Sequence, residues 1–261
     1  MASVYGDISG HREVLAAACY LGHDDEWRTA IDEWRLILAD AGVSHFHATD
    51  FFNARKEFAG WSLNDERHVE FAKRFAAVAD KAGLVGFAYV MDAAAFREVL
   101  APELEREQRQ HKASHDRLYA SMCALGAADK FLAKTGYRVR HAIPVTFEHE
   151  QGAGRFKSFF NESRQRGERW TWWFQSFETA PKETIPCQLA DLLAHEAWRR
   201  GSGLLQRSDR AIRKSLQRML ERERLEMRLL TRANAEENAR LVRDVLASYP
   251  DGLRPPDALG P

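Results

Sequence analysis

The chain has 261 residues, of which 45% are hydrophobic and 29% charged, which is typical of a globular protein with room for one large domain. Its 38 basic and 38 acidic residues give a formal net charge of zero, so overall charge indicates neither nucleic-acid nor membrane binding. No apolar run approaches the roughly 20 residues of a membrane span, and we expect no membrane insertion.

Three cysteines, Cys19, Cys123 and Cys187, stand far apart in apolar stretches without a CxxC pair. This pattern favours buried free thiols over a disulfide framework or a zinc site. The N-terminal MASVYGDISG lacks the features of a secretory signal. A cytoplasmic location is therefore expected, because the reducing cytoplasm keeps thiols free.

The first half of the chain alternates between the hydrophobic periods of strands and helices. The predicted elements are a strand hairpin, a helix, a strand that leads into a loop, a second helix, a buried central strand and a short helix: Ser3–Ser9 with Val14–Leu21, Glu26–Ala41, Val43–Asn53, Glu66–Ala82, Leu84–Met91 and Ala93–Leu100. Gly42 and Gly83 follow the two long helices, where glycine typically ends a helix.

The second half continues the alternation. We predict a solvated connection or helix face, a long helix, a strand, a helix, an aromatic strand and an apolar helix: Glu103–His111, Ser114–Lys134, His141–Phe147, Arg155–Gln165, Trp170–Phe177 and Ile185–Arg200. This order favours an α/β fold, a mixed sheet flanked by helices. It divides the chain into an α/β domain (1–204), an Arg-rich helical C-terminal extension packed on it (205–250) and a disordered tail (251–261).

Acids and histidines stand at four places where predicted strands end or helices begin. Asp7, with Ser9 and Gly10, is either turn chemistry or part of a site. The segment from Ser44 to Asp50 holds His45, His47 and Asp50, which supply either metal ligands or a general base, unless Thr49 and Asp50 only cap the next element.

The other two places lie later in the chain. Glu148 and Glu150 share one face if their strand continues, and they are either solvated strand-end acids or part of a site. Gln188, Asp191 and His195 share one face of an otherwise apolar helix. Burying Asp191 without a partner would cost several kcal/mol, so it needs either a cation or a hydrogen-bond network. This helix is the strongest single functional signal.

Clustered carboxylates repel one another unless they take up protons or bind a cation. One or two Mg²⁺ or Mn²⁺ ions would resolve that repulsion and would activate water for phosphodiester hydrolysis.

Three motifs together resemble the family catalogued as domain of unknown function 3800: Asp7-Ile8-Ser9-Gly10, the HATD segment (His47–Asp50) and QLADLLA (Gln188–Ala194). The resemblance spans about Ser3 to Arg200. It implies a ribonuclease H-like fold and a suspected metal-dependent nuclease, with Asp7, His47, Asp50, Glu148, Gln188 and Asp191 as the functional positions. One departure is Ile8, where the family's DESG motif has an acid, and it allows altered or absent activity.

Two further features concern the substrate. The region between Arg207 and Arg243 carries basic residues at three- and four-residue spacing: Arg210, Arg213, Lys214, Arg218, Arg222, Arg224, Arg228 and Arg232. They either contact the phosphates of a nucleic acid or pair with nearby glutamates on a solvated helix. Trp170, Trp172 and Trp173 either stack bases or belong to the core.

These features support three functional hypotheses. The first is a divalent-metal-dependent nuclease acting on DNA or RNA, with Asp7, Glu148 and Asp191 as ligands. Asp50 is then a further ligand or an orienting acid, His47 handles protons or contacts the scissile phosphate, and Gln188 fixes a carboxylate or a water. The second is a catalytically silent nucleic-acid- or protein-binding module on the same fold. The third is a metal-dependent hydrolase of small phosphoesters or nucleotides.

Overall fold

The computed structural model describes residues 1–10, 13–62, 65–107, 116–135, 143–149, 153–167, 171–206, 217, 220–221 and 224–248. Among these residues, six strands form one mixed sheet in the order β5-β4-β1-β2-β3-β6. The strands are β1 (Ala2–Gly10), β2 (Val14–His23), β3 (Val85–Asp92), β4 (Ile143–Glu148), β5 (Phe174–Ala180) and β6 (Leu225–Leu230). β1, β2 and β3 form an antiparallel meander, while β4 is parallel to β1, β5 to β4 and β6 to β3.

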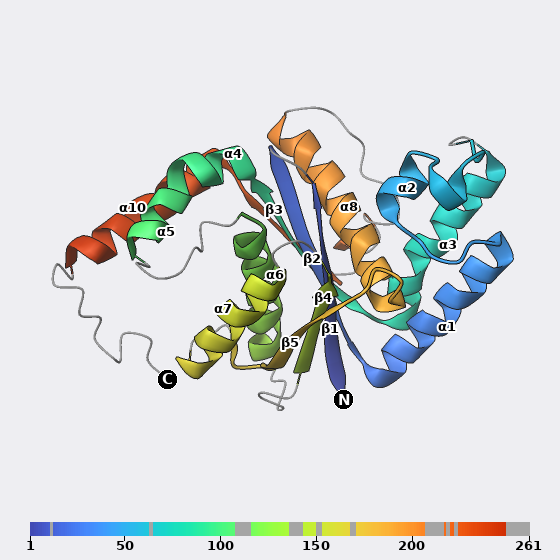
Figure 1. The fold of residues 1–261 in the computed structure, drawn as a ribbon, viewed down its shortest axis with the longest axis horizontal. Helices are drawn as coiled ribbons and strands as arrows, with labels where there is room; N and C mark the ends of the chain where they lie inside the picture. The colour runs from blue at the N-terminus through green and yellow to red at the C-terminus, as the bar shows by residue number, and fades with distance from the viewer. Residues whose placement is uncertain are drawn as a thin grey trace.

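Helices cover both faces of the sheet (Figure 1). One face carries α1 (Asp24–Ala41), α2 (Ala48–Phe52), α3 (Glu66–Ala82) and α8 (Ile185–Leu205). The other carries α4 (Ala93–Ala95), a π-helical turn (Phe96–Leu100), α5 (Ala101–Glu107), α6 (Asp116–Lys134), α7 (Ala153–Gln165) and α10 (Arg232–Ser248). β2 is buried on both faces, and its alternate residues enter two separate cores. The predicted mixed α/β sheet flanked by helices is confirmed.

Two predicted strands differ from the structure. The segment Val43–Asn53 contains α2 and no strand, because Phe46 and Phe51 are buried in an aromatic cluster against α1 and α3 and do not pair with the sheet. β5 begins at Phe174, where its pairing with β4 starts, and not at Trp170, which lies outside the described residues. Trp173 is buried in the core, as its alternative interpretation held.

The C-terminal part is not helical throughout. Leu225–Leu230 forms β6, because Leu225 and Leu230 enter the two cores and the strand extends the sheet beside β3. Glu103 was expected on a solvated segment, but it is only 7% exposed in α5. Its carboxylate forms an ion pair with Arg243 at 3.0 Å. The tail 251–261 lies outside the described residues, as do Arg210, Arg213, Lys214, Arg218 and Arg222.

The cysteines are free, as expected, with Cys19 and Cys187 buried and Cys123 half-buried. In the described part of the chain, no helix has the length and apolar character needed to cross a bilayer.

Candidate active site

Asp7 lies beneath helix α8 because of the strand period. β1 directs Val4 into the core on the α6 side and Tyr5 into the core on the α8 side, and Asp7 follows Tyr5 by two residues. Asp191 projects from α8, and the two side chains are hydrogen-bonded to each other. Asp7 is 4% and Asp191 5% exposed. A hydrogen bond between two carboxyl groups requires that one of them hold a proton, and we call these two residues the carboxyl pair.

The surroundings of Asp191 favour its neutral form. Burial raises the pKa of its carboxyl, and the nearby Asp50 charge adds to that effect. The charge of His47, the Asp7 hydrogen bond and the Ala48 N–H, which donates to Oδ2 at 2.7 Å, act in the opposite direction. Burial prevails, so the pKa of Asp191 lies above its usual range.

The HATD segment is held beside the carboxyl pair by its flanking phenylalanines. Phe46 and Phe51 have ring centroids 5.5 Å apart, and both are buried. His47 then stands at the start of α2, with Asp50 in its first turn. This segment and α8 are far apart in the sequence, and aromatic packing together with the hydrogen bonds of the Phe46 and Ala48 amides to α8 brings them together.

Asp50 is paired with two basic side chains. Lys56 Nζ donates to Asp50 Oδ2 at 2.8 Å. His47 Nδ1 lies 3.2 Å from the same oxygen, within ion-pair distance, but the angles do not make a hydrogen bond, and this buried atom has no hydrogen-bond partner among the described residues. Burial raises the pKa of Asp50, but Lys56 and His47 outweigh it and hold the pKa below its usual range. The pKa values of Asp50 and Asp191 are therefore shifted in opposite directions, Asp50 downward and Asp191 upward.

The loop that carries Lys56 is strained. Ala54 and Lys56 have positive φ angles of 49° and 51°, a region that side chains other than glycine rarely adopt. Such strain costs of the order of 1 kcal/mol or more and tends to occur at functional sites.

Gln188 braces the site through hydrogen bonds to three other groups. Its Oε1 accepts from Trp34 Nε1 at 3.0 Å and from the Phe46 amide at 2.9 Å. Its Nε2 donates to the Glu183 carbonyl at 2.9 Å. Gln188 therefore joins α1 and α8 to the backbone just before His47, which makes it a positioning residue.

Glu148 ends β4 next to Asp7. Gly6 pairs with Phe147, so the following residues, Asp7 and Glu148, are level on adjacent parallel strands. Cys187 of α8 lies near both: burial, followed by the charges of Asp7 and Glu148, raises the pKa of its thiol to about 12. Such a thiol is protonated and unreactive at neutral pH. Glu148 is half-buried, more open to solvent than the carboxyl pair.

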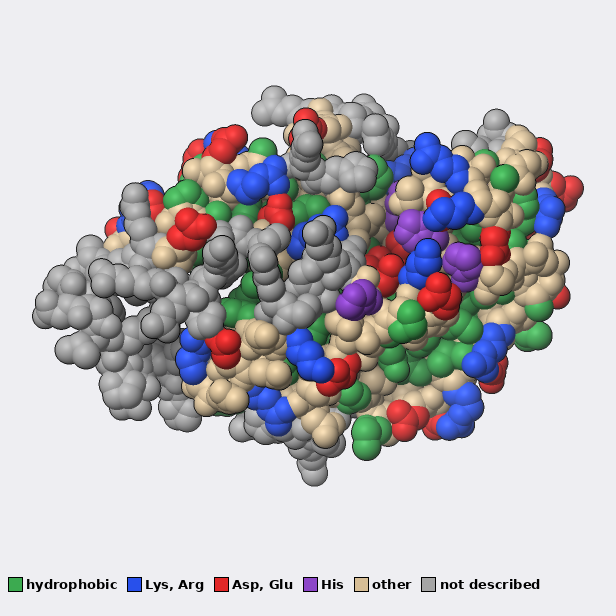
Figure 2. Space-filling view, in the orientation of Figure 1, with side chains coloured by type: hydrophobic (Ala, Val, Ile, Leu, Met, Phe, Trp, Pro, Cys, Tyr) green, Lys and Arg blue, Asp and Glu red, His purple; other side chains and the backbone are tan. Residues whose placement is uncertain are grey.

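Two other histidines named by the sequence analysis, His45 and His195, have different partners. His45 Nδ1 lies 3.0 Å from Glu57 Oε1. The His195 ring stacks on Phe52 with centroids 4.7 Å apart. On the molecular surface, histidine, acidic and basic side chains gather beside α2 and α8 (Figure 2).

The donor set fits a hard divalent cation in its chemistry. Carboxylate oxygens are the ligands that Mg²⁺ and Mn²⁺ prefer. A cation bound between the two carboxylates would relieve their repulsion, as a proton does in its absence. In the described ranges, however, no three His, Cys, Asp or Glu side chains are already grouped closely enough to hold an ion. Binding would therefore require Glu148 or Asp50 to move toward the pair.

Sequence reasoning missed two contributors to this site. Lys56 stands in a loop with no motif of its own, and its contact depends on an unusual backbone angle. The Ala48 N–H is a backbone group, so no residue type could reveal it.

Comparison with protein-family models and with curated proteins gives no match. The resemblance to the domain of unknown function 3800 family therefore depends on the three short motifs alone.

Proposed function

We propose that this protein is a divalent-metal-dependent nuclease with a ribonuclease H-like fold, related to the domain of unknown function 3800 family. The observation that carries the proposal is the buried carboxyl pair of Asp7 and Asp191, joined by Glu148 on the adjacent strand. Buried acids destabilise a fold, so two of them together on a central strand and the helix that covers it favour a functional role.

The sheet supports the fold assignment. A three-stranded antiparallel meander, continued past its first strand by two parallel strands, is the arrangement expected of a ribonuclease H-like sheet. β6 would be an addition at the opposite edge, next to β3.

The roles of the site residues derive from their contacts. Asp7, Asp191 and Glu148 would hold Mg²⁺ or Mn²⁺, which when bound supplies activation of the attacking water and stabilisation of the leaving oxygen. Asp50, fixed by Lys56, lies within ion-pair distance of His47 and would stabilise its protonated form. Histidine is the side chain best suited to proton transfer near neutral pH, so His47 would exchange a proton with the substrate.

A catalytically silent binding module is the second candidate. Two observations favour it: Ile8 stands where the resembling family has an acid, and Lys56 already neutralises Asp50. Either feature would weaken cation binding.

The test is cleavage of end-labelled single- and double-stranded DNA and RNA with Mg²⁺ or Mn²⁺. Asp191→Asn is the sharpest variant, because the amide oxygen can still accept from the Ala48 N–H while the carboxylate is lost. We expect cleavage by the wild type that chelator abolishes and that Asp191→Asn lowers at least 100-fold.

Asp129→Asn is the matched control. Asp129 is also a buried acid, 6% exposed, but it lies on α6 across the sheet. Its substitution should leave the cleavage rate within a few-fold. Folded wild-type protein that cuts none of the four substrates would reject the nuclease and favour the silent module.

A further inference from the structure

A cavity of about 750 Å³ opens beside the carboxyl pair, further along the same strand and helix. Gly10 follows Asp7 by three residues on β1, and Trp198 follows Asp191 by seven on α8. At about 3.3 Å per strand residue and 1.5 Å per helix residue, each step covers about 10 Å. Seven residues are nearly two turns, so Trp198 and Asp191 share one face of α8.

Strand and helix meet closely at this point. Gly10 has a φ of +113°, and a Cβ atom there would lie 2.7 Å from Trp198 Cδ1. Glycine therefore lets the indole lie against the end of the β1–β2 hairpin, at the cavity wall.

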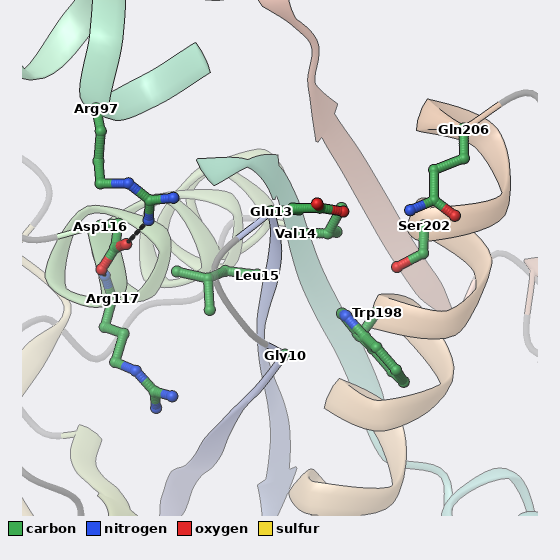
Figure 3. A pocket seen from close by; sticks show the side chains of 10 residues that line it. All are labelled: Gly10, Glu13, Val14, Leu15, Arg97, Asp116, Arg117, Trp198, Ser202 and Gln206. Carbon is green, nitrogen blue, oxygen red and sulfur yellow. Dashed lines mark hydrogen bonds and ion pairs between the residues drawn. The ribbon is translucent and has the colours of Figure 1, made fainter. Parts of the chain in front are cut away.

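The lining combines one aromatic ring with balanced polar groups. Trp198 and Ser202 line it from successive turns of α8, and Gln206 lines it from the residue that caps this helix. Figure 3 shows them across the cavity from Arg97 and Arg117. The two arginines are balanced by Glu13 and Asp116, and Arg97 Nη1 lies 2.6 Å from Asp116 Oδ2. Among the residues that the structure describes, the charges of the lining are thus balanced, which suits a planar, uncharged, hydrogen-bonding group better than a free phosphate.

We propose that this cavity binds one unpaired nucleobase of a single-stranded substrate, next to the phosphate being cleaved. The inference rests on the proposed nuclease function. The indole of Trp198 supplies a stacking surface, and the Ser202 hydroxyl and Gln206 amide offer donors and acceptors to a base edge. A base enters such a cavity only when it is neither paired nor stacked in a duplex, so the proposal selects single strands or frayed ends.

The test is binding without cleavage, in the presence of chelator, of a single-stranded oligonucleotide that contains 2-aminopurine. Stacking on Trp198 should quench its fluorescence. We expect Trp198→Ala to weaken binding roughly 10-fold and remove the quench, and Trp198→Phe to retain most of both. The matched control is Leu204→Ala: this exposed apolar side chain stands on the same helix but outside the described cavity lining, and its loss should change neither.

Several outcomes would overturn the subsite. They are an unchanged affinity and quench in Trp198→Ala, equal quenching by a fully paired duplex, or adenosine monophosphate binding as tightly as the oligonucleotide. Circular dichroism establishes that each variant is folded. If Trp198→Ala is not, Gln206→Ala at the exposed end of α8 takes its place, and unchanged affinity there contradicts the proposal equally. Intact quenching without cleavage in Mn²⁺ would reject the nuclease and leave the subsite standing.

Discussion

Asp191 and Asp50 belong to one cluster, but the pKa of Asp191 is raised while the pKa of Asp50 is lowered. Burial raises the pKa of Asp191 and so favours its neutral form, whereas Lys56 and His47 lower the pKa of Asp50 and favour its ionised form. Environments that separate two acids in this way are typical of catalytic sites, where one group must carry charge while its neighbour carries a proton.

This contrast predicts two separate pH windows of stability. The folded pKa of Asp191 is raised, so its contribution favours the folded state below the ordinary value of 3.8 and is lost as pH rises through the folded pKa. In chelator, we expect the free energy of unfolding to fall as pH rises above about 4, and Asp191→Asn to flatten that fall. Urea denaturation across pH 4 to 8 measures it.

Asp50→Asn serves as the control. Because the folded pKa of Asp50 is lowered, its stabilising contribution is present above 3.8 and is lost as pH falls through the lower folded value. This variant should change the slope mainly in that acid window, with a smaller flattening above pH 4, because the Asp50 charge contributes to the raised pKa of Asp191. A slope above pH 4 that both variants flatten equally would contradict the assignment to Asp191.

Cation binding is a second prediction at the same residue. A cation that binds only the folded state stabilises it by about 2.7 kcal/mol at 100 times its dissociation constant. We expect Mn²⁺ to raise the melting temperature of the wild type and to leave that of Asp191→Asn unchanged, as followed by differential scanning calorimetry. Equal shifts in both proteins would mean that the ion binds elsewhere.

At the scale of elements, the sequence predicted those that carry their own local signals. α3 was predicted over Glu66–Ala82, to the residue, because Asp65 and Gly83 mark its ends and its apolar residues keep the helical period. β6 was missed because LEMRLL is rich in helix-favouring residues, and its strand conformation depends on pairing with the distant β3.

In the candidate site too, the sequence identified individual residues, whereas their contacts depend on the tertiary fold. The sequence motifs predicted each of the candidate residues separately, because acids and amides are unusual in apolar elements: Asp7, His47, Asp50, Glu148, Gln188 and Asp191. Contact between Asp7 and Asp191 depends on where α8 crosses β1, which no local pattern encodes. The interactions of Gln188 with Trp34 and the Phe46 amide likewise appear only in the fold, and they change its expected role from fixing a carboxylate to bracing the segment.

The close packing of α8 against β3 depends on Gly201 and can be tested by substitution there. A Cβ atom there would lie 2.1 Å from Val90 Cγ1, so Gly201→Ala should displace α8 and destabilise the fold by about 1–3 kcal/mol. Val90→Ala removes the closest atom and leaves only Val90 Cβ, at 2.9 Å, so we expect the double variant to be more stable than the sum of the single changes by about 1 kcal/mol in urea denaturation.

Gly126→Ala is the matched control, since a Cβ at this α6 position has no atom of the described residues within 4 Å. It should be neutral or stabilising by up to about 1 kcal/mol, because alanine favours helices over glycine. Additive effects of Gly201→Ala and Val90→Ala would show that the two residues do not conflict.

For the whole molecule, β6 bears on where the domain ends. The sequence predicted an α/β domain over 1–204, but β6 pairs along β3 and places Leu225 in one core and Leu230 in the other. We expect a chain cut after residue 204 to expose the β3 edge and to aggregate or to lose cooperative unfolding. Gel filtration and a urea titration against the full chain decide it: a monomeric fragment of equal stability would restore the predicted boundary.

The position of β6 also has a consequence for synthesis. A ribosome releases β1, β2 and β3 early, but the strand that covers the β3 edge emerges only once Leu225–Leu230 has been synthesised, long after β3. Until then a nascent chain carries an open strand edge beside an apolar surface, which is where association with other chains begins. Translation that stalls before residue 225 would therefore yield a product prone to aggregation, and we expect chaperone demand to be highest in that interval.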